Sequence, residues 1–205
     1  MDKAVIDYRK IAEAVDYYVG LGYKYIEVPW IVQKEYIDIT KPKNSNSIDT
    51  FLGSLVGSGE QSFLSIKDRL LNEKYVCVTP CFRDENPVTE LHRNYFMKVE
   101  LIHIKPKYPV THCFSMLMDA FGFFSRYGRV SMKETKEGFD LEINGVEVGS
   151  YGIRETQKDY SYLIGVDFGS EFGGGSTLIE DYQMKFNWVY GTGCAEPRLS
   201  QAIGS

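Results

Sequence analysis

Two stretches, Cys81-Phe82-Arg83-Asp84-Glu85 and Tyr95-Phe96-Met97-Lys98-Val99-Glu100, carry the strongest fold signal in this chain. They predict the two strands of an antiparallel hairpin, joined by a polar loop. Because side chains of a strand alternate between its faces, Lys98 and Glu100 share one face. Two interpretations stay open. The strands could present these charges to a small polar ligand, or the face could be solvated and carry cross-strand ion pairs.

A second hairpin is predicted around Asn144-Gly145, which is typical of a two-residue type I′ turn. The turn predicts three direct pairs: Ile143 with Val146, Glu142 with Glu147, and Leu141 with Val148. Asp140, Glu142 and Glu147 then share the polar face. Carboxylates directly opposite one another repel, so we expect compensation by a divalent cation, a basic side chain or water. Oxygen ligands suit Mg²⁺, which binds through one or two carboxylates plus substrate phosphates.

Hydrophobic periodicity predicts the remaining elements. An amphipathic helix runs from about Ala4 to Val19 and ends at Gly20 and Gly22. A strand over 25–31 follows, with Pro29 at an edge or a bulge. The other expected segments are a loop over 41–50, a helix over 62–71, a strand over 75–82, a helix over 112–127 and strands over 132–150. This order predicts an α+β fold, an antiparallel β-sheet flanked by helices.

Length, charge and cysteine content limit the classes of function that the chain can have. A chain of 205 residues suits a single domain over 1–205. The net charge of −5 argues against a general polyanion binder. The start carries no apolar leader and no run approaches a membrane span, so we expect a cytoplasmic protein with no membrane partner. The four cysteines form no C-x-x-C pair, which favours buried free thiols over a zinc site.

Phe82-Arg83-Asp84-Glu85, the loop with His92 and Arg93, and the return strand from Phe96 to Glu100 resemble motif 2 of class II aminoacyl-tRNA synthetases. The pattern is most similar to the aspartyl and asparaginyl enzymes and to ammonia-dependent asparagine synthetase. Further segments follow in the family's order: Val28-Pro29-Trp30, residues 147–154 and residues 191–198. The resemblance implies a class II catalytic core without an anticodon-binding domain. It also implies a homodimer formed through the N-terminal helix and the Pro29 strand.

The resemblance implies an ATP site. Arg83 and Arg198 are the expected catalytic residues, because a guanidinium binds phosphate through two parallel donors and keeps its charge. The expected ATP-binding residues are Arg83, Glu85, His92, Phe96, Glu147 and Arg198. Asp140 and Glu147 are the expected ligands of the Mg²⁺ that accompanies ATP. Ala195 departs from the family, which commonly has a glycine there, and the chain ends soon after Arg198.

The amino-acid site is expected at Glu60, Gln61, Glu100 and Arg154. Either Glu60 or Gln61 matches the position that binds the substrate's amino group. Arg154 matches an arginine that grips a carboxylate of aspartate, although a structural ion pair is the alternative.

The implied activity is ATP- and Mg-dependent activation of an amino acid, aspartate or a similar one, as an aminoacyl-adenylate that is transferred to tRNA. Two alternatives stay open. An amide-forming ligase of the asparagine synthetase type would pass the adenylate to ammonia or another amine. A non-catalytic paralogue would bind nucleotide or amino acid only.

Overall fold

The computed structural model describes residues 6–43, 45–84, 94–104, 107–136, 138–156 and 160–168, the residues 155, 156 and 160–168 without their side chains. All of them belong to one compact unit. The single domain expected over 1–205 stays a prediction, because residues 169–205 lie outside the described part.

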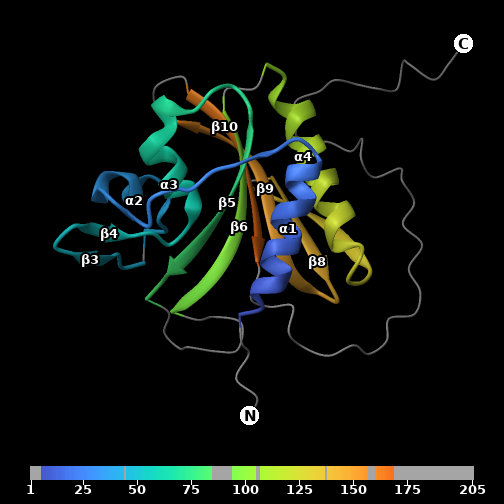
Figure 1. Cartoon of the computed structure of the whole chain (residues 1–205), viewed down its shortest axis with the longest axis horizontal. Helices are drawn as coiled ribbons and strands as arrows, with labels where there is room; N and C mark the ends of the chain where they lie inside the picture. The colour runs from blue at the N-terminus through green and yellow to red at the C-terminus, as the bar shows by residue number, and fades with distance from the viewer. Residues whose placement is uncertain are drawn as a thin grey trace, which may run out of the picture. The chain divides into compact units, whose positions relative to one another are not determined.

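A seven-stranded sheet forms the centre of this unit (Figure 1). Its strand order is β1 (Lys24–Tyr25), β5 (Lys74–Phe82), β6 (Tyr95–Ile104), β10 (Tyr160–Phe168), β9 (Val146–Thr156), β8 (Gly138–Ile143) and β7 (Val130–Thr135). Only the short β1 pairs in parallel, with β5; every other pair in this sheet is antiparallel. The predicted α+β fold on an antiparallel sheet is confirmed.

Two helices cover one face of the sheet (Figure 1). Helix α1 (Tyr8–Gly20) packs against β5 and β6, and α4 (Pro109–Phe124) packs against β9 and β10. The apolar positions of the strands fill the space beneath them, with Val76, Met97, Val99, Leu101, Leu141 and Tyr151 all buried. The expected N-terminal helix therefore exists. It begins at Tyr8 because the Asp7 side chain accepts a hydrogen bond from the Arg9 backbone N–H at 3.0 Å.

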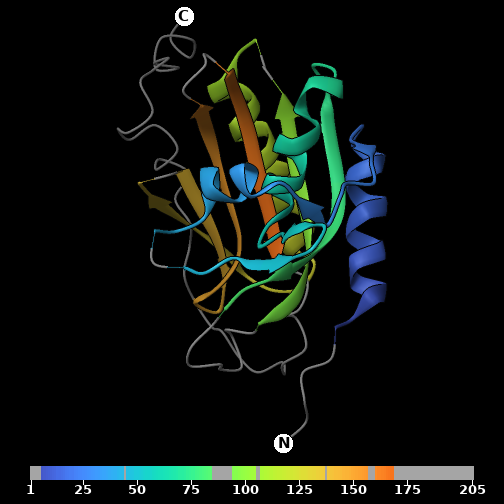
Figure 2. The same cartoon turned by 90° about the vertical axis from the view of Figure 1, so that its left-hand side faces the viewer.

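The opposite face carries a second layer (Figure 2). It contains α3 (Gly59–Ile66), the 3₁₀ turn Lys67–Arg69, α2 (Lys34–Thr40) and a three-stranded sheet. That sheet has the order β2 (Ile31–Val32), β4 (Gly53–Leu55) and β3 (Ile48–Thr50). Phe63 and Leu64 of α3 pack on the sheet against Tyr75, Cys77 and Ile102.

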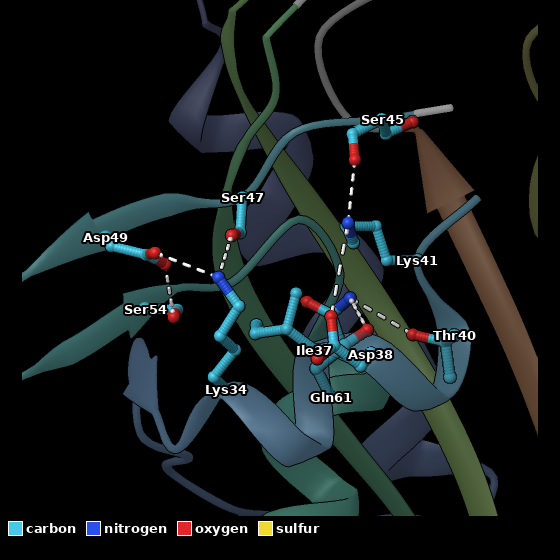
Figure 3. Close-up of polar contacts among 10 residues, drawn as sticks. All are labelled: Lys34, Ile37, Asp38, Thr40, Lys41, Ser45, Ser47, Asp49, Ser54 and Gln61. Carbon is cyan, nitrogen blue, oxygen red and sulfur yellow. Dashed lines mark hydrogen bonds and ion pairs between the residues drawn. The ribbon is translucent and has the colours of Figure 1, made fainter. Parts of the chain in front are cut away.

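Polar contacts tie α2 to this small sheet (Figure 3). Lys34 donates to the Ser47 hydroxyl at 3.2 Å and to the Asp49 carboxylate at 3.0 Å, while Asp49 accepts from Ser54 at 2.6 Å. The bonds to Ser54, Lys34 and Ser47 lower the pKa of Asp49 to about 2. The carboxylate therefore stays charged at any ordinary pH and holds the hairpin against α2.

Three expectations for this region were wrong in part. The strand expected over 25–31 is two strands in two different sheets. Between them the Ile26 N–H bonds to the Val76 carbonyl, and the Trp30 carbonyl accepts from Val56. Pro29, which has no N–H to continue a ladder, lies between the last bond to the large sheet at Ile26 and the first bond to the small sheet at Trp30. The loop expected over 41–50 ends in β3. The helix expected over 62–71 begins at Gly59, because Ser58 caps it.

Candidate functional site

The charged residues of both predicted hairpins lie on one face of the large sheet. Residues of β6 and β8 are connected through the register of the strands between them: Glu100 pairs with Val166, Val166 with Ser150, and Ser150 with Asp140. Directly paired residues point to the same side of a sheet. This is the side on which α3 packs, because Cys77 pairs with Glu100 and belongs to the cluster beneath α3. The two hairpins therefore contribute to one surface.

Lys98 and Glu100 are buried on this surface. The Lys98 side chain is 3% exposed and that of Glu100 0%, and the ammonium lies 3.9 Å from the carboxylate oxygen Oε1. The interpretation of a solvated strand face is therefore wrong here. A buried ion pair costs desolvation energy that its attraction only partly repays, so this pair is costly as a purely structural element.

The first turn of α3 lies directly against Glu100. The Ser58 hydroxyl accepts from the Glu60 N–H at 3.2 Å and donates to Glu100 Oε1 at 2.9 Å. Gly59 packs so closely that a Cβ on it would overlap Glu100 Oε2. This contact requires a residue without a side chain, and it places the start of a helix at the buried carboxylate.

Glu60 and Arg154 meet across the site. Arg154 Nε on β9 lies 3.7 Å from Glu60 Oε1 on α3, and the Glu60 side chain is only 10% exposed. The sequence could not separate Glu60 from Gln61, and the structure brings only Glu60 to Arg154. The Gln61 amide instead accepts from the Gly57 N–H at 2.8 Å. It also donates to Thr40 at 3.1 Å (Figure 3). Gln61 thus ties α3 to α2 and to the loop before α3.

Arg83 and Phe96 are neighbours at the end of the first hairpin. The Arg83 guanidinium carbon lies 5.1 Å from the centre of the Phe96 ring, and Lys98 Nζ lies 5.5 Å from it. Arg83 also donates to the Gly57 carbonyl at 3.4 Å, and its backbone N–H bonds to Asn94. The Phe96 ring is mostly buried, at 8% exposure, and the group beside it is a half-buried guanidinium, which is suited to phosphate. Glu85, His92 and Arg198 lie outside the described residues.

Burial shifts the pKa values of the charged side chains in the site. Burial raises the pKa of Glu100, and the neighbouring Glu60 carboxylate raises it further, while Lys98, the Ser58 hydroxyl and Arg83 lower it. Burial lowers the pKa of Lys98, and Glu100 opposes that change. Two carboxylates that repel each other in a site closed to water favour a bound cationic group.

The second hairpin forms as predicted at its turn. Asn144 and Gly145 both have positive φ, 58° and 77°, and the pairs Ile143–Val146 and Glu142–Glu147 are confirmed. The third pair is wrong. A register shift puts Leu141 opposite Gly149 and Asp140 opposite Ser150, because an extra residue enters β9 as a bulge.

A basic side chain partly offsets the repulsion between the carboxylates of Glu142 and Glu147, which lie opposite each other. Lys133 Nζ of β7 lies 3.6 Å from Glu142 Oε1. Asp140 is half-buried and Glu147 is exposed. Among the described residues, no group of three or more Asp, Glu, His or Cys side chains could hold a metal. Asp140 lies opposite Ser150 and Glu147 opposite Glu142. Each offers oxygen donors, the ligand type that Mg²⁺ takes together with water and substrate phosphates.

The described cysteines are free and buried, as expected. Burial raises the pKa of the Cys81 thiol to about 12 and that of Cys77 well above its usual range. These thiols are therefore neutral and unreactive at ordinary pH. Cys194 lies outside the described residues. Within the described part of the chain, no helix has the length and apolar character needed to cross a membrane.

Sequence reasoning missed three contributors to the site: Ser58, Gly59 and Thr79. Ser58 had a local signal, because a serine followed by an acidic residue before an apolar run is typical of a helix start. Gly59 and Thr79 had no such signal, since their role depends on which element covers the strand face. Strand alternation predicted the face of Lys98 but not its burial.

Of the comparisons with known proteins, the one with solved structures found similar folds. No family model and no curated protein matches the chain. The crystal structure of pyrrolysyl-tRNA synthetase from Desulfitobacterium hafniense is similar, with a TM-score of 0.63 and 13% identity, over 80% of this chain and 66% of that one. PylSc, a pyrrolysyl-tRNA synthetase from the same organism, has a TM-score of 0.60 and 14% identity, over 82% and 68%. The chain thus has the fold of class II synthetase catalytic domains and spans about two thirds of these structures.

Proposed function

We propose that this chain is an ATP-dependent ligase that activates an amino acid as an aminoacyl-adenylate and passes it to tRNA. One observation carries the proposal: three residue pairs gather at a single face of the sheet in a class II synthetase-like fold. The pairs are Arg83–Phe96, Lys98–Glu100 and Glu60–Arg154.

The ATP half of the site is assigned to the end of the first hairpin. Arg83 binds the α-phosphate, and the Phe96 ring stacks on the adenine. Support comes from the distance of 5.1 Å between them, since a guanidinium, a group suited to phosphate, lies beside an aromatic ring. Glu85, His92 and Arg198 complete this half in the proposal.

The amino-acid half is assigned to the start of α3 and to β9. Glu60 and Glu100 bind the substrate's ammonium, since both carboxylates are buried and Glu60 raises the pKa of Glu100. Gln61 stabilises the position of α3 through its bonds to Gly57 and Thr40. Arg154 binds a side-chain carboxylate, which makes aspartate or a similar acidic amino acid the proposed substrate. The two similar structures described above are pyrrolysyl-tRNA synthetases, so the closer relation to aspartyl and asparaginyl enzymes rests on the sequence motifs alone.

Asp140 and Glu147 are the proposed Mg²⁺ ligands. The ion would neutralise charge on the ATP phosphates when bound there. Lys133 holds Glu142 at 3.6 Å, which leaves the metal to the other two carboxylates.

The chemical step needs no general base. An amino-acid carboxylate is already ionised at neutral pH, so its oxygen attacks the α-phosphorus directly and pyrophosphate leaves. Arg83 stabilises the charge that builds on the α-phosphate, and the buried carboxylates orient the substrate. The adenylate then transfers its acyl group to the acceptor. Transfer to tRNA by a cytoplasmic homodimer is the first proposal, and transfer to ammonia or another amine is the alternative.

Pyrophosphate exchange into ATP, measured with each amino acid in turn, tests the activation step. We expect exchange that depends on an acidic amino acid. Exchange with neutral amino acids alone would contradict the role of Arg154. Absence of exchange with all of them would leave a non-catalytic binding protein. AMP release stimulated by tRNA, compared with ammonia, then identifies the acceptor.

A further inference from the structure

Glu100 binds the substrate's ammonium in the proposed activation step, but its buried partner Lys98 has no role in that step. The nitrogen and oxygen are 3.9 Å apart. This exceeds the N–H···O range of about 2.7–3.2 Å, so Lys98 acts on Glu100 through its charge. A lysine–glutamate pair at 3% and 0% exposure is expensive to bury, which calls for a function that an apolar pair could not supply.

Contacts from α3 hold the Glu100 carboxylate in one orientation. Ser58 donates to Oε1 at 2.9 Å, and the Gly59 backbone packs against Oε2. Neither Glu100 Oε2 nor the Thr79 hydroxyl has a hydrogen-bond partner among the described residues. The carboxylate is thus fixed in place and keeps an unused acceptor oxygen.

The described titratable neighbours of Glu100 lie on α3, on β5 and just after it, and on β6. Glu60 on α3 disfavours its ionised form, while Arg83 after β5 and Lys98 on β6 favour it. Cys77 on β5 is neutral, because burial raises its pKa well above the usual range. A carboxylate without water and without a cation takes up a proton instead of staying charged. Lys98 opposes the protonation of Glu100 more strongly than Arg83 does.

We propose that Lys98 is a positioning residue of the amino-acid site, whose buried ammonium keeps Glu100 a charged carboxylate able to bind the substrate's ammonium group. The proposal rests on the proposed function, since it needs an amino acid as the ligand. Protonated Glu100 would offer a neutral hydroxyl and lose the attraction to a cation. Lys98 therefore controls substrate affinity through Glu100, without touching the substrate.

The test is the pH dependence of KM for the amino acid in pyrophosphate exchange. In Lys98→Met we expect KM at pH 7 to rise by about tenfold, because most Glu100 side chains are then protonated and only the ionised fraction binds the ammonium. kcat should change far less. The KM deficit should shrink as pH rises towards 9, because Glu100 then ionises without help. Lys98→Arg keeps the positive charge and should retain the wild-type profile.

Two further variants separate this role from a structural one. In a Glu100→Gln background, Lys98→Met should leave KM unchanged, because no carboxylate remains to be held. Lys34→Met is the matched control, since it removes an exposed lysine paired with Asp49 at 3.0 Å and should not alter the KM profile. A KM deficit of equal size at every pH, or one that persists in the Glu100→Gln background, would overturn the proposal.

A titration of the Glu100 carboxyl carbon by NMR gives a readout besides activity. Wild-type Glu100 should be ionised at pH 7, and Lys98→Gln should move its titration to higher pH. A protonated Glu100 in the wild-type protein at pH 7 would refute the proposal even if Lys98→Met failed to fold. If no amino acid supports exchange, the proposed function fails, and this titration still decides the relation between Lys98 and Glu100.

Discussion

Arg154 on β9 and Glu60 on α3 form an ion pair across the candidate site, with 3.7 Å between Nε and Oε1. Each is the expected ligand of an opposite charge on an amino-acid substrate. Without a substrate the two charges neutralise each other; the Arg154 side chain is 26% exposed and that of Glu60 is 10% exposed. A zwitterionic amino acid with an acidic side chain can replace both contacts at once, its ammonium meeting Glu60 and its carboxylate Arg154.

Substitutions at Glu60 and Gln61 should have different effects. Glu60→Gln removes a charge from the site and should raise KM for the amino acid by roughly thirtyfold, about 2 kcal/mol for a lost charged hydrogen bond. Gln61→Ala should instead lower the free energy of unfolding by about 1–3 kcal/mol, because it leaves the Gly57 N–H without its partner. Exchange kinetics and urea unfolding measure the two effects. The reverse pattern would assign the amino group to Gln61.

Loss of Arg83 should nearly abolish activation. Removing a group that stabilises transition-state charge commonly costs about 3 kcal/mol, on the order of a hundredfold in rate. Pyrophosphate exchange by Arg83→Ala measures it. Arg126→Ala serves as control, since Arg126 pairs with Glu13 on the surface at 3.2 Å. If Arg83→Ala keeps exchange near the wild-type rate, Arg83 does not contact the α-phosphate.

Gly59→Ala should destabilise the protein and weaken amino-acid binding together. The new methyl would overlap Glu100 Oε2 and lie 2.8 Å from the Thr79 hydroxyl. Overpacking of this kind costs about 1–3 kcal/mol, and it displaces α3 from Glu100. Gly20→Ala is the matched control, because nothing lies within 4 Å of its added Cβ. Thermal unfolding and KM report the effects. A Gly59→Ala protein as stable as Gly20→Ala would contradict the close approach.

Asp140→Asn should raise the Mg²⁺ concentration needed for half-maximal exchange by about tenfold, because it removes one of two charged ligands. Glu134→Gln, an exposed position on the neighbouring strand β7, should leave that concentration unchanged. Mg²⁺ titration of the exchange rate measures both. Equal requirements in the two variants would exclude Asp140 as a ligand.

Stability should fall at mildly acidic pH because of His103. Burial, His112 and Lys74 lower its pKa from 6.5 to about 4, so the native state favours the neutral ring. The ring contacts Asn72 at 3.1 Å and lies 4.7 Å from the His112 ring. Its contribution is fully present above pH 6.5 and is lost as pH falls towards 4, up to about 3 kcal/mol at about 1.4 kcal/mol per unit.

Urea unfolding between pH 7 and pH 4 measures this loss. The slope should be shallower in His103→Asn, which cannot take up a proton. An identical slope in both proteins would assign the acid sensitivity to other groups.

Local signals were sufficient for much of the fold. Alternating side chains predicted that Lys98 and Glu100 share a face, and Asn144-Gly145 predicted a turn that the structure confirms. Such patterns depend on near neighbours, which a sequence contains in full. The short strands β3 and β4 were not predicted, and β2 was expected only as the end of a longer strand over 25–31. Strands of two or three residues have no pattern of their own and form only because distant segments bond to them.

The register of the second hairpin shows where local reasoning ends. Turn chemistry predicted the pairs nearest Asn144-Gly145 correctly, but the bulge puts Leu141 opposite Gly149. An inserted residue depends on how the strand packs further along, where Leu141 and Tyr151 enter the core beneath the helices. The choice between Glu60 and Gln61 was beyond the sequence for the same reason, since adjacent helix residues point in different directions.

By itself the sequence determined which side chains share a strand face, because the two-residue period of a strand is a local property of the backbone. Only the tertiary structure decided that this face is closed to water. The cap at Ser58 and the missing side chain at Gly59 let α3 pack directly on Glu100. Burial then changes the energetics of the same charges, because a carboxylate and an ammonium that water would screen become dependent on each other.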